Sequence, residues 1–161
     1  MSRAFVKESA ESAPPPERMI SDGPNPVTQA GYEKIVAEVA RLESALKSET
    51  NVLLRETLER DLRYWAVKKA SAEIAPPPDG AAIAFGSRVT LTRNGKTQSF
   101  QIVGEDEADP ARALVSWGSP LVQAVIGAEE GDTIEMEKPK GEIVIVKVQN
   151  DWSPWPGQAR P

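Results

Sequence analysis

The 161-residue sequence contains neither cysteine nor histidine. The absence of cysteine excludes disulfide bonds, catalysis by a thiolate and zinc sites built from cysteine. The absence of histidine removes the usual general base near neutral pH and the commonest metal ligand. Thiol and imidazole groups are therefore excluded from any catalytic or metal site of this chain.

Long apolar stretches are also absent. No run approaches the ~20 residues that a membrane-spanning helix needs, and residues 1–10 lack the apolar stretch of a signal peptide. The formal net charge of −5 disfavours free duplex DNA as a partner, because affinity for it comes largely from Lys and Arg neutralising phosphates. These features predict a cytoplasmic protein, expected to be a monomer, that binds neither membranes nor free duplex DNA.

The first half of the chain predicts a disordered lead-in followed by two helices. Residues 1–26 are rich in Pro, Ser and Glu and lack apolar periodicity. A first helix is expected to begin at the N-capping Thr28, and the triple proline at 76–78 ends a second one. Apolar residues recur at spacings of three and four along both helices: Tyr32, Ile35, Val39, Leu42 and Leu46, then Leu54, Leu58, Leu62 and Trp65, with Ala72 further along.

Two apolar stripes joined by a short turn predict an antiparallel coiled-coil hairpin over residues 27–75, followed by a linker at 76–82. The turn is expected at Lys47, Ser48, Glu49, Thr50 and Asn51. A plain helical hairpin packed on another part of the chain is the alternative to a projecting arm.

The charges of the hairpin balance, with eight acidic and eight basic side chains between residues 33 and 73. The basic residues are unevenly distributed between the two helices. Five of the eight lie on the second helix: Arg55, Arg60, Arg63, Lys68 and Lys69. An ion-paired, solvated surface is the favoured interpretation. The other is a face toward RNA formed by Arg55, Arg60 and Arg63, which lacks interleaved aromatic residues.

The second half, residues 83–149, changes to an alternating pattern typical of strands. Strands are expected at 88–92, 99–103, 113–117, 133–137 and 142–148. Asn94 and Gly95 predict a two-residue hairpin turn, and Ser119-Pro120 predicts the start of a short helix over 121–126. This order predicts an α+β domain, in which one short helix covers a small, mostly antiparallel sheet. In residues 150–161, Trp152 and Trp155 predict an intramolecular latch or a partner contact.

Several blocks resemble the GreA/GreB transcript-cleavage factor family. Residues 102–109 (IVGEDEAD), 119–121 (SPL) with 126–132 (IGAEEGD), and 139–142 (PKGE) follow one another at that family's separations. In the first half, residues 27–32 (VTQAGY) resemble the family's entry into its first arm helix. Residues 60–64 (RDLRY) resemble its second arm helix, and residues 2–5 (SRAF) are similar to some GreB-like N-termini. The chain thus resembles a GreB-like member over nearly its whole length.

The resemblance implies an antiparallel coiled-coil arm on an FKBP-like domain and RNA polymerase as the partner. It implies docking at the rim of the polymerase secondary channel through Gly118, Ser119, Pro120 and Leu121, with the arm directed at the active site. Fully active members carry two acidic residues at the arm tip. These help the polymerase hold Mg²⁺ and a water that cuts backtracked RNA, so the metal would belong to the polymerase. The resemblance therefore implies a chain that is not an enzyme and has no catalytic residue, metal site or cofactor of its own.

The chain departs from the family at the tip and at the docking edge. Matching residues 60–64 to the family leaves about two turns of each helix without a counterpart, which shortens the arm by roughly 10 Å at 5.4 Å per turn. Residues 47–51 hold one acid beside one lysine rather than an acidic pair. Weak or absent cleavage stimulation is therefore predicted. Gly118 stands where GreB-like members often have Asp, which predicts altered docking affinity.

Three other functions compete with this interpretation. One is an active cleavage factor with a rearranged tip. Another is an FKBP-type prolyl isomerase, suggested by the fold alone and disfavoured because such a pocket needs clustered aromatic residues. A third is an interaction module with a partner other than polymerase. For Ser119-Pro120 itself, a plain helix N-terminus is the simpler interpretation.

Overall fold

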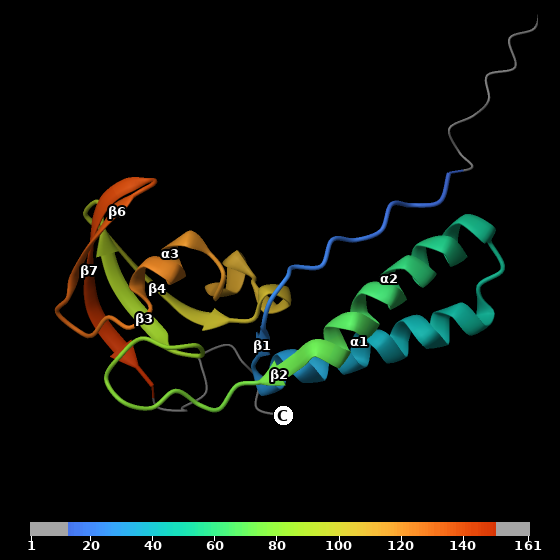
Figure 1. Ribbon diagram of the computed structural model, residues 1–161, viewed down its shortest axis with the longest axis horizontal. Helices are drawn as coiled ribbons and strands as arrows, with labels where there is room; N and C mark the ends of the chain where they lie inside the picture. The colour runs from blue at the N-terminus through green and yellow to red at the C-terminus, as the bar shows by residue number, and fades with distance from the viewer. Residues whose placement is uncertain (1–12, 151–161) are drawn as a thin grey trace, which may run out of the picture. The chain divides into compact units, whose positions relative to one another are not determined.

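The computed structural model describes residues 13–150, which form two compact units (Figure 1). The first unit contains residues 13–23 and 35–70, and the second contains 24–34 and 71–150. Residues 1–12 and the predicted latch at Trp152 and Trp155 lie outside the described residues. Within the described residues, no helix is long and apolar enough to cross a membrane.

Two consecutive helices, α1 (Gln29–Ser48) and α2 (Val52–Ser71), lie side by side (Figure 1). Each has 20 residues, a length of about 30 Å at 1.5 Å per residue. The prediction of two helices, with Thr28 just before the first, is confirmed. Lys47 and Ser48 belong to the last turn of α1, so the connection is shorter than predicted and covers residues 49–51.

The predicted apolar stripe is right for α1 and partly wrong for α2. In α1, Ile35, Val39 and Leu42 are buried. In α2, Leu54 is 54% exposed, whereas the buried residues are Tyr64 and Lys68. Residues four apart share a face of a helix, so the buried face of α2 passes through a tyrosine and a lysine, which a search for apolar residues does not detect.

The prediction of a disordered lead-in over 1–26 is wrong at its C-terminal end. Strand β1 (Asn25–Val27) pairs in parallel with β2 (Ala72–Ile74), so Asn25 and Pro26 are part of a sheet. The pairing also ends α2 at Ser71, before the prolines that were expected to stop it. Its cause is long-range, because the two strands are separated by the whole helical hairpin.

Five further strands form one sheet in the order β5-β4-β3-β7-β6. They are β3 (Arg88–Arg93), β4 (Lys96–Val103), β5 (Leu114–Ser116), β6 (Thr133–Glu137) and β7 (Lys140–Gln149). The two-residue turn at Asn94 and Gly95 is confirmed, and both residues have positive φ. The sheet is mostly antiparallel, as predicted, and is mixed because β4 and β5 pair in parallel. The 3-10 helices η2 (Glu105–Glu107) and η3 (Pro110–Arg112) lie in the crossover between β4 and β5.

Helix α3 (Pro120–Val125) packs on this sheet and completes the core of the second unit, which confirms the α+β class. Ser119 caps the helix by accepting a hydrogen bond from the Val122 amide at 3.3 Å. The core is a single apolar cluster: Ile83, Val89, Leu91, Phe100, Ile102, Val122, Val125, Met136, Ile143 and Ile145.

The carboxylate of Glu107 joins the crossover of the sheet to the start of α1. It accepts hydrogen bonds from the Thr28 amide at 3.1 Å and the Gly104 amide at 2.9 Å, and from the Thr28 hydroxyl. The Thr28 hydroxyl in turn accepts from the Gly31 amide at 3.0 Å. Since α1 has no acidic residue in its first turn, Glu107 supplies the negative charge that a helix N-terminus favours.

Two glycines make room for this carboxylate. A Cβ on Gly31 would lie 2.1 Å from the carboxyl carbon of Glu107. A Cβ on Gly104 would lie 2.7 Å from the backbone oxygen of Pro26. The glycines therefore permit close approach between segments that are more than 70 residues apart in sequence. The predicted boundary between arm and sheet domain needs correction, since residues 24–34 and 71–75 belong to the same unit as the sheet.

We predict that Glu107→Ala lowers the free energy of unfolding by about 2 kcal/mol, because it removes a charged acceptor and leaves three donors without it. Gly31→Ala should also destabilise, because its methyl group collides with the Glu107 carboxylate. In the double variant the collision is gone, so its loss of unfolding free energy should be smaller than the sum of the two single-variant losses. Urea unfolding measures all three. Strict additivity would contradict the proposed contact.

Candidate functional site

The tip of the hairpin is a closed turn in which polar side chains are bound to backbone groups. The Glu49 carboxylate accepts a hydrogen bond from the Asn51 amide at 2.8 Å. The Asn51 side chain accepts one from the Leu54 amide at 3.1 Å, and so caps α2. Arg55 donates to the backbone oxygens of Leu46 at 2.8 Å and Glu49 at 3.0 Å, and so closes the end of α1.

This arrangement provides no metal-holding pair at the tip. Glu49 is the only acid among residues 47–51, and its carboxylate is bound to the turn. Among the described residues, no group of three or more His, Cys, Asp or Glu side chains could hold a metal ion. The next residues along α2 are instead apolar and exposed, with Val52 at 68% and Leu54 at 54%. The predicted tip residues thus lie together, and the hydrogen bonds of Glu49 and Asn51 stabilise the turn.

We predict that Arg55→Ala destabilises the hairpin by about 1–2 kcal/mol, because two carbonyl oxygens at the end of α1 lose a charged donor. Hydrogen exchange at residues 46–51 should speed up in this variant. Lys47→Ala is the matched control, since Lys47 is an exposed base in the last turn of α1, the helix end that Arg55 closes. Equal exchange rates in the two variants would show that Arg55 does not close the helix.

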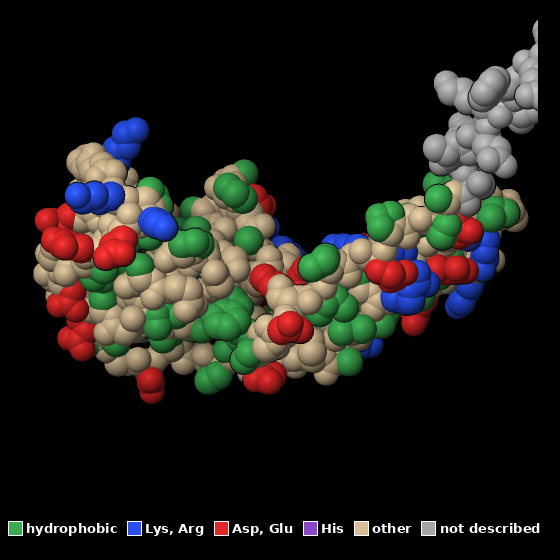
Figure 2. All heavy atoms as spheres, turned by 45° about the horizontal axis from the view of Figure 1, so that its top comes forward, with side chains coloured by type: hydrophobic (Ala, Val, Ile, Leu, Met, Phe, Trp, Pro, Cys, Tyr) green, Lys and Arg blue, Asp and Glu red, His purple; other side chains and the backbone are tan. Residues whose placement is uncertain are grey.

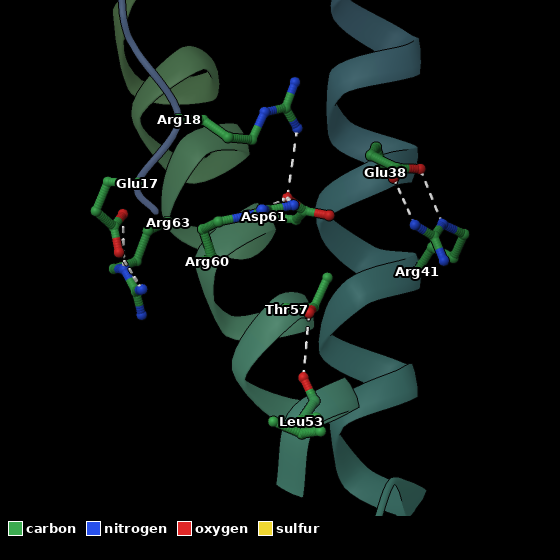
Figure 3. Close-up of polar contacts among 9 residues, drawn as sticks. All are labelled: Glu17, Arg18, Glu38, Arg41, Leu53, Thr57, Arg60, Asp61 and Arg63. Atoms are coloured by element: carbon green, nitrogen blue, oxygen red, sulfur yellow. Dashed lines mark hydrogen bonds and ion pairs between the residues drawn. The ribbon is translucent and has the colours of Figure 1, made fainter. Parts of the chain in front are cut away.

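The three arginines that the sequence suggested for an RNA-facing surface have separate environments. Arg55 closes α1, as described above, and also lies 3.5 Å from Glu59. Arg60 pairs with Asp61 at 2.8 Å, and Arg63 pairs with Glu17 (Figure 3). On the face drawn in Figure 2, acidic and basic side chains are interspersed over the hairpin. These contacts favour the ion-paired interpretation.

The contact with Glu17 involves a segment whose composition predicts disorder. Residues 13–23, here called the N-terminal segment, belong to the same unit as the hairpin. The Glu17 carboxylate accepts hydrogen bonds from the Arg63 guanidinium, which lower the pKa of Glu17. Arg18 lies 3.7 Å from the Asp61 carboxylate and 3.7 Å above the centre of the Tyr64 ring. Composition hid both residues, because the neighbouring prolines dominate the segment.

The predicted docking edge, Gly118 to Leu121, lies at the start of α3 in the second unit. Gly118 and Pro120 are exposed, and Ser119 and Leu121 are half-buried. A hydrogen bond links α3 to the residue before this edge, because the Gln123 side chain donates to the Trp117 backbone oxygen at 2.7 Å. A Cβ on Gly118 would meet only the Ser116 hydroxyl, at 3.8 Å. A larger residue therefore fits at position 118.

Among the described residues, three aromatic side chains of the second unit belong to its apolar core or pack against it. Phe100 is buried in the core, and Phe85 and Trp117 pack against it. No observation on the described residues therefore favours the prolyl isomerase alternative.

Comparison with known proteins identifies the family. Residues 78–150 match the family model described as the C-terminal part of the transcription elongation factor GreA/GreB. The transcription elongation factor GreA of Verminephrobacter eiseniae is 31% identical over 151 aligned residues, covering 75% of this chain and 96% of that protein. GreA of Helicobacter pylori is 30% identical over 145, covering 73% and 87%. These are elongation factors, and this chain belongs to the GreA/GreB family.

A solved structure, the GreA factor homolog 1 (Gfh1) of Thermus thermophilus, is 22% identical and covers 79% of this chain and 99% of that one. Its TM-score of 0.38 is too low to support a structural comparison.

The alignment lengths show that this chain lacks part of its relatives. Three-quarters of 161 residues is about 121 residues, yet the alignment with the Verminephrobacter protein has 151 positions. About 30 positions of that relative therefore have no counterpart here.

Proposed function

We propose that this chain binds RNA polymerase and regulates transcription elongation without stimulating RNA cleavage. In this proposal the edge from Gly118 to Leu121 docks at the rim of the secondary channel, and α1 and α2 form a coiled-coil arm that enters it. The proposal places the chain in the cytoplasm with its polymerase. Support comes from membership of the GreA/GreB family and from the exposure of Gly118 and Pro120.

The closed tip is the observation that carries the non-cleaving part of the proposal. Mg²⁺ is bound through oxygen ligands in strict geometry at about 2.1 Å, usually with one or two carboxylates beyond its waters. The Glu49 carboxylate already accepts a hydrogen bond from the Asn51 amide, and no second acid stands beside it. Apolar residues, Val52 to Leu54, occupy the adjacent positions. A tip of this composition lacks the ligands that a metal-activated water requires.

The length of the arm supports the same conclusion. We assign the roughly 30 missing positions to the hairpin, because its helices have only 20 residues each. Divided between two helices, they correspond to about four turns per helix, or roughly 20 Å at 5.4 Å per turn. This is more than the two turns that the pattern match indicated. Carboxylates held that far from a metal centre could not reach it, even if the tip contained them.

Capture of RNA polymerase tests the docking. The full chain, immobilised, should retain the core polymerase subunits at physiological salt. Failure to bind purified polymerase would refute this function and leave the interaction module with another partner as the better hypothesis.

A cleavage assay on backtracked complexes tests the tip. We predict that the chain leaves the rate of RNA cleavage within about two-fold of the rate for polymerase alone, and that Glu49→Ala changes nothing further. A GreA protein in the same assay is the positive control. Cleavage that depends on this chain and is lost in Glu49→Ala would support the rearranged active tip instead.

Substitution at the edge tests the docking residues. We predict that Gly118→Asp changes the affinity for polymerase, because it restores the acid that GreB-like members often carry there. Its unfolding free energy should change by less than about 0.5 kcal/mol, since a side chain fits at this exposed position. Glu129→Asp, an exposed conservative change elsewhere in the second unit, is the control. Unchanged affinity in Gly118→Asp would remove position 118 from the docking surface.

A further inference from the structure

The N-terminal segment makes a two-residue contact with the hairpin that its composition does not predict. Glu17 pairs with Arg63 and Arg18 pairs with Asp61, so adjacent residues of the segment contact a base and an acid that lie two positions apart on α2 (Figure 3). The charges are complementary at both positions. Because both ion pairs form in one register, the extended segment has a defined position on α2.

The surroundings of Arg18 have the properties of an arginine-binding site. Its guanidinium lies 3.7 Å above the centre of the Tyr64 ring and 5.5 Å from that of Trp65. The two rings pack edge to face with centroids 5.1 Å apart, which holds the tyrosine face in place. A planar cation is attracted to such a face, and Arg makes this stacking contact better than Lys does.

An acidic group of α2 completes the site, because the Asp61 carboxylate lies 3.7 Å from the Arg18 guanidinium. Tyr64 is 9% exposed even though it lies on a hairpin helix. The aromatic face of Tyr64, beside the Asp61 carboxylate, therefore takes the guanidinium of this chain's own Arg18.

The ion pairs of this contact are exposed to solvent. The side chains of Glu17 and Arg63 are 64% and 56% exposed, and that of Arg18 is 36% exposed. Ion pairs with such exposure are weak and are screened by salt. The segment is covalently attached, however, so it competes at an effective concentration in the millimolar range.

We propose that Glu17 and Arg18 are a tethered competitor for an arginine-binding surface on α2. That surface, formed by Asp61, Arg63, Tyr64 and Trp65, binds an arginine-bearing segment of a partner protein when the N-terminal segment is released. The partner sequence that fits has an acid directly before the arginine, as in Glu17-Arg18. The acid then meets Arg63, and the arginine meets the Tyr64 ring and Asp61, which also pairs with Arg60.

Peptide binding to the full chain tests this inference. The probe is a synthetic peptide of residues 13–23, and NMR follows the Trp65 indole and the backbone amides of residues 60–66. The Glu17→Gln/Arg18→Ala protein should bind the peptide at least about five-fold more tightly than the wild-type chain, because its own segment no longer competes. Met19→Ala is the matched control, since Met19 is 93% exposed in the same segment, and should behave as wild type.

Two further variants locate the site. A peptide carrying Arg18→Ala should not bind, and a peptide carrying Arg18→Lys should bind more weakly than the original. Adding Asp61→Asn to the double variant should abolish binding. If circular dichroism shows that this variant has lost helix, Trp65→Leu replaces it, and binding is then followed by the backbone amides of residues 60–66 alone. Equal peptide affinity for wild-type and double-variant proteins, or no binding to either at millimolar peptide, would overturn the inference.

A second measurement asks whether the partner is the polymerase, and this step rests on the proposed function. The Glu17→Gln/Arg18→Ala protein should bind polymerase about five-fold more tightly than wild type, and Asp61→Asn should reverse the gain. Identical affinities of all three would exclude the polymerase as the source of the arginine segment while leaving the docking intact. Failure of every form to bind would refute the proposed function, and the peptide experiment would still decide the site.

Discussion

A single carboxylate, that of Glu107, joins the start of α1 to the crossover of the sheet, and the second unit depends on this junction. It accepts hydrogen bonds from Thr28 and Gly104, so it fixes the N-terminus of α1 against the crossover of the sheet. Because Gly31 and Gly104 have no Cβ, the backbone can approach this closely. The β1–β2 pairing lies beside this junction in sequence. Together these contacts define where the first helix begins.

At the tip of the hairpin too, polar and charged side chains form hydrogen bonds with backbone groups. Glu49, Asn51 and Arg55 satisfy amides and carbonyls that helix ends leave without partners. A short hairpin has few internal contacts, so its ends need such capping. A carboxylate used in this way is a poor metal ligand, which connects the stability of the turn to the proposed loss of cleavage stimulation.

Much of the fold and part of the site could be predicted from local patterns. Thr28, Ser119-Pro120 and Asn94-Gly95 act on their immediate neighbours, so the helix starts and the hairpin turn were predicted correctly. The parallel β5, the strand β1 and the buried face of α2 were not, because each depends on a partner far away in sequence. The contacts of Glu17 and Arg18 with α2 were hidden for the same reason: a Pro-rich composition describes an isolated segment and not one that meets an aromatic face.

The sequence by itself determined the family, the two helices, the strand pattern and the lack of an acidic pair at the tip. These follow from the order and kind of residues, which no packing can change. The tertiary structure alone decided what the charged residues do. Arg55, Arg63 and Glu107 look alike in sequence as solvated charges, yet one closes a helix, one holds the N-terminal segment and one anchors α1. The difference is physical, because the value of a charge depends on the groups that folding places within hydrogen-bonding distance.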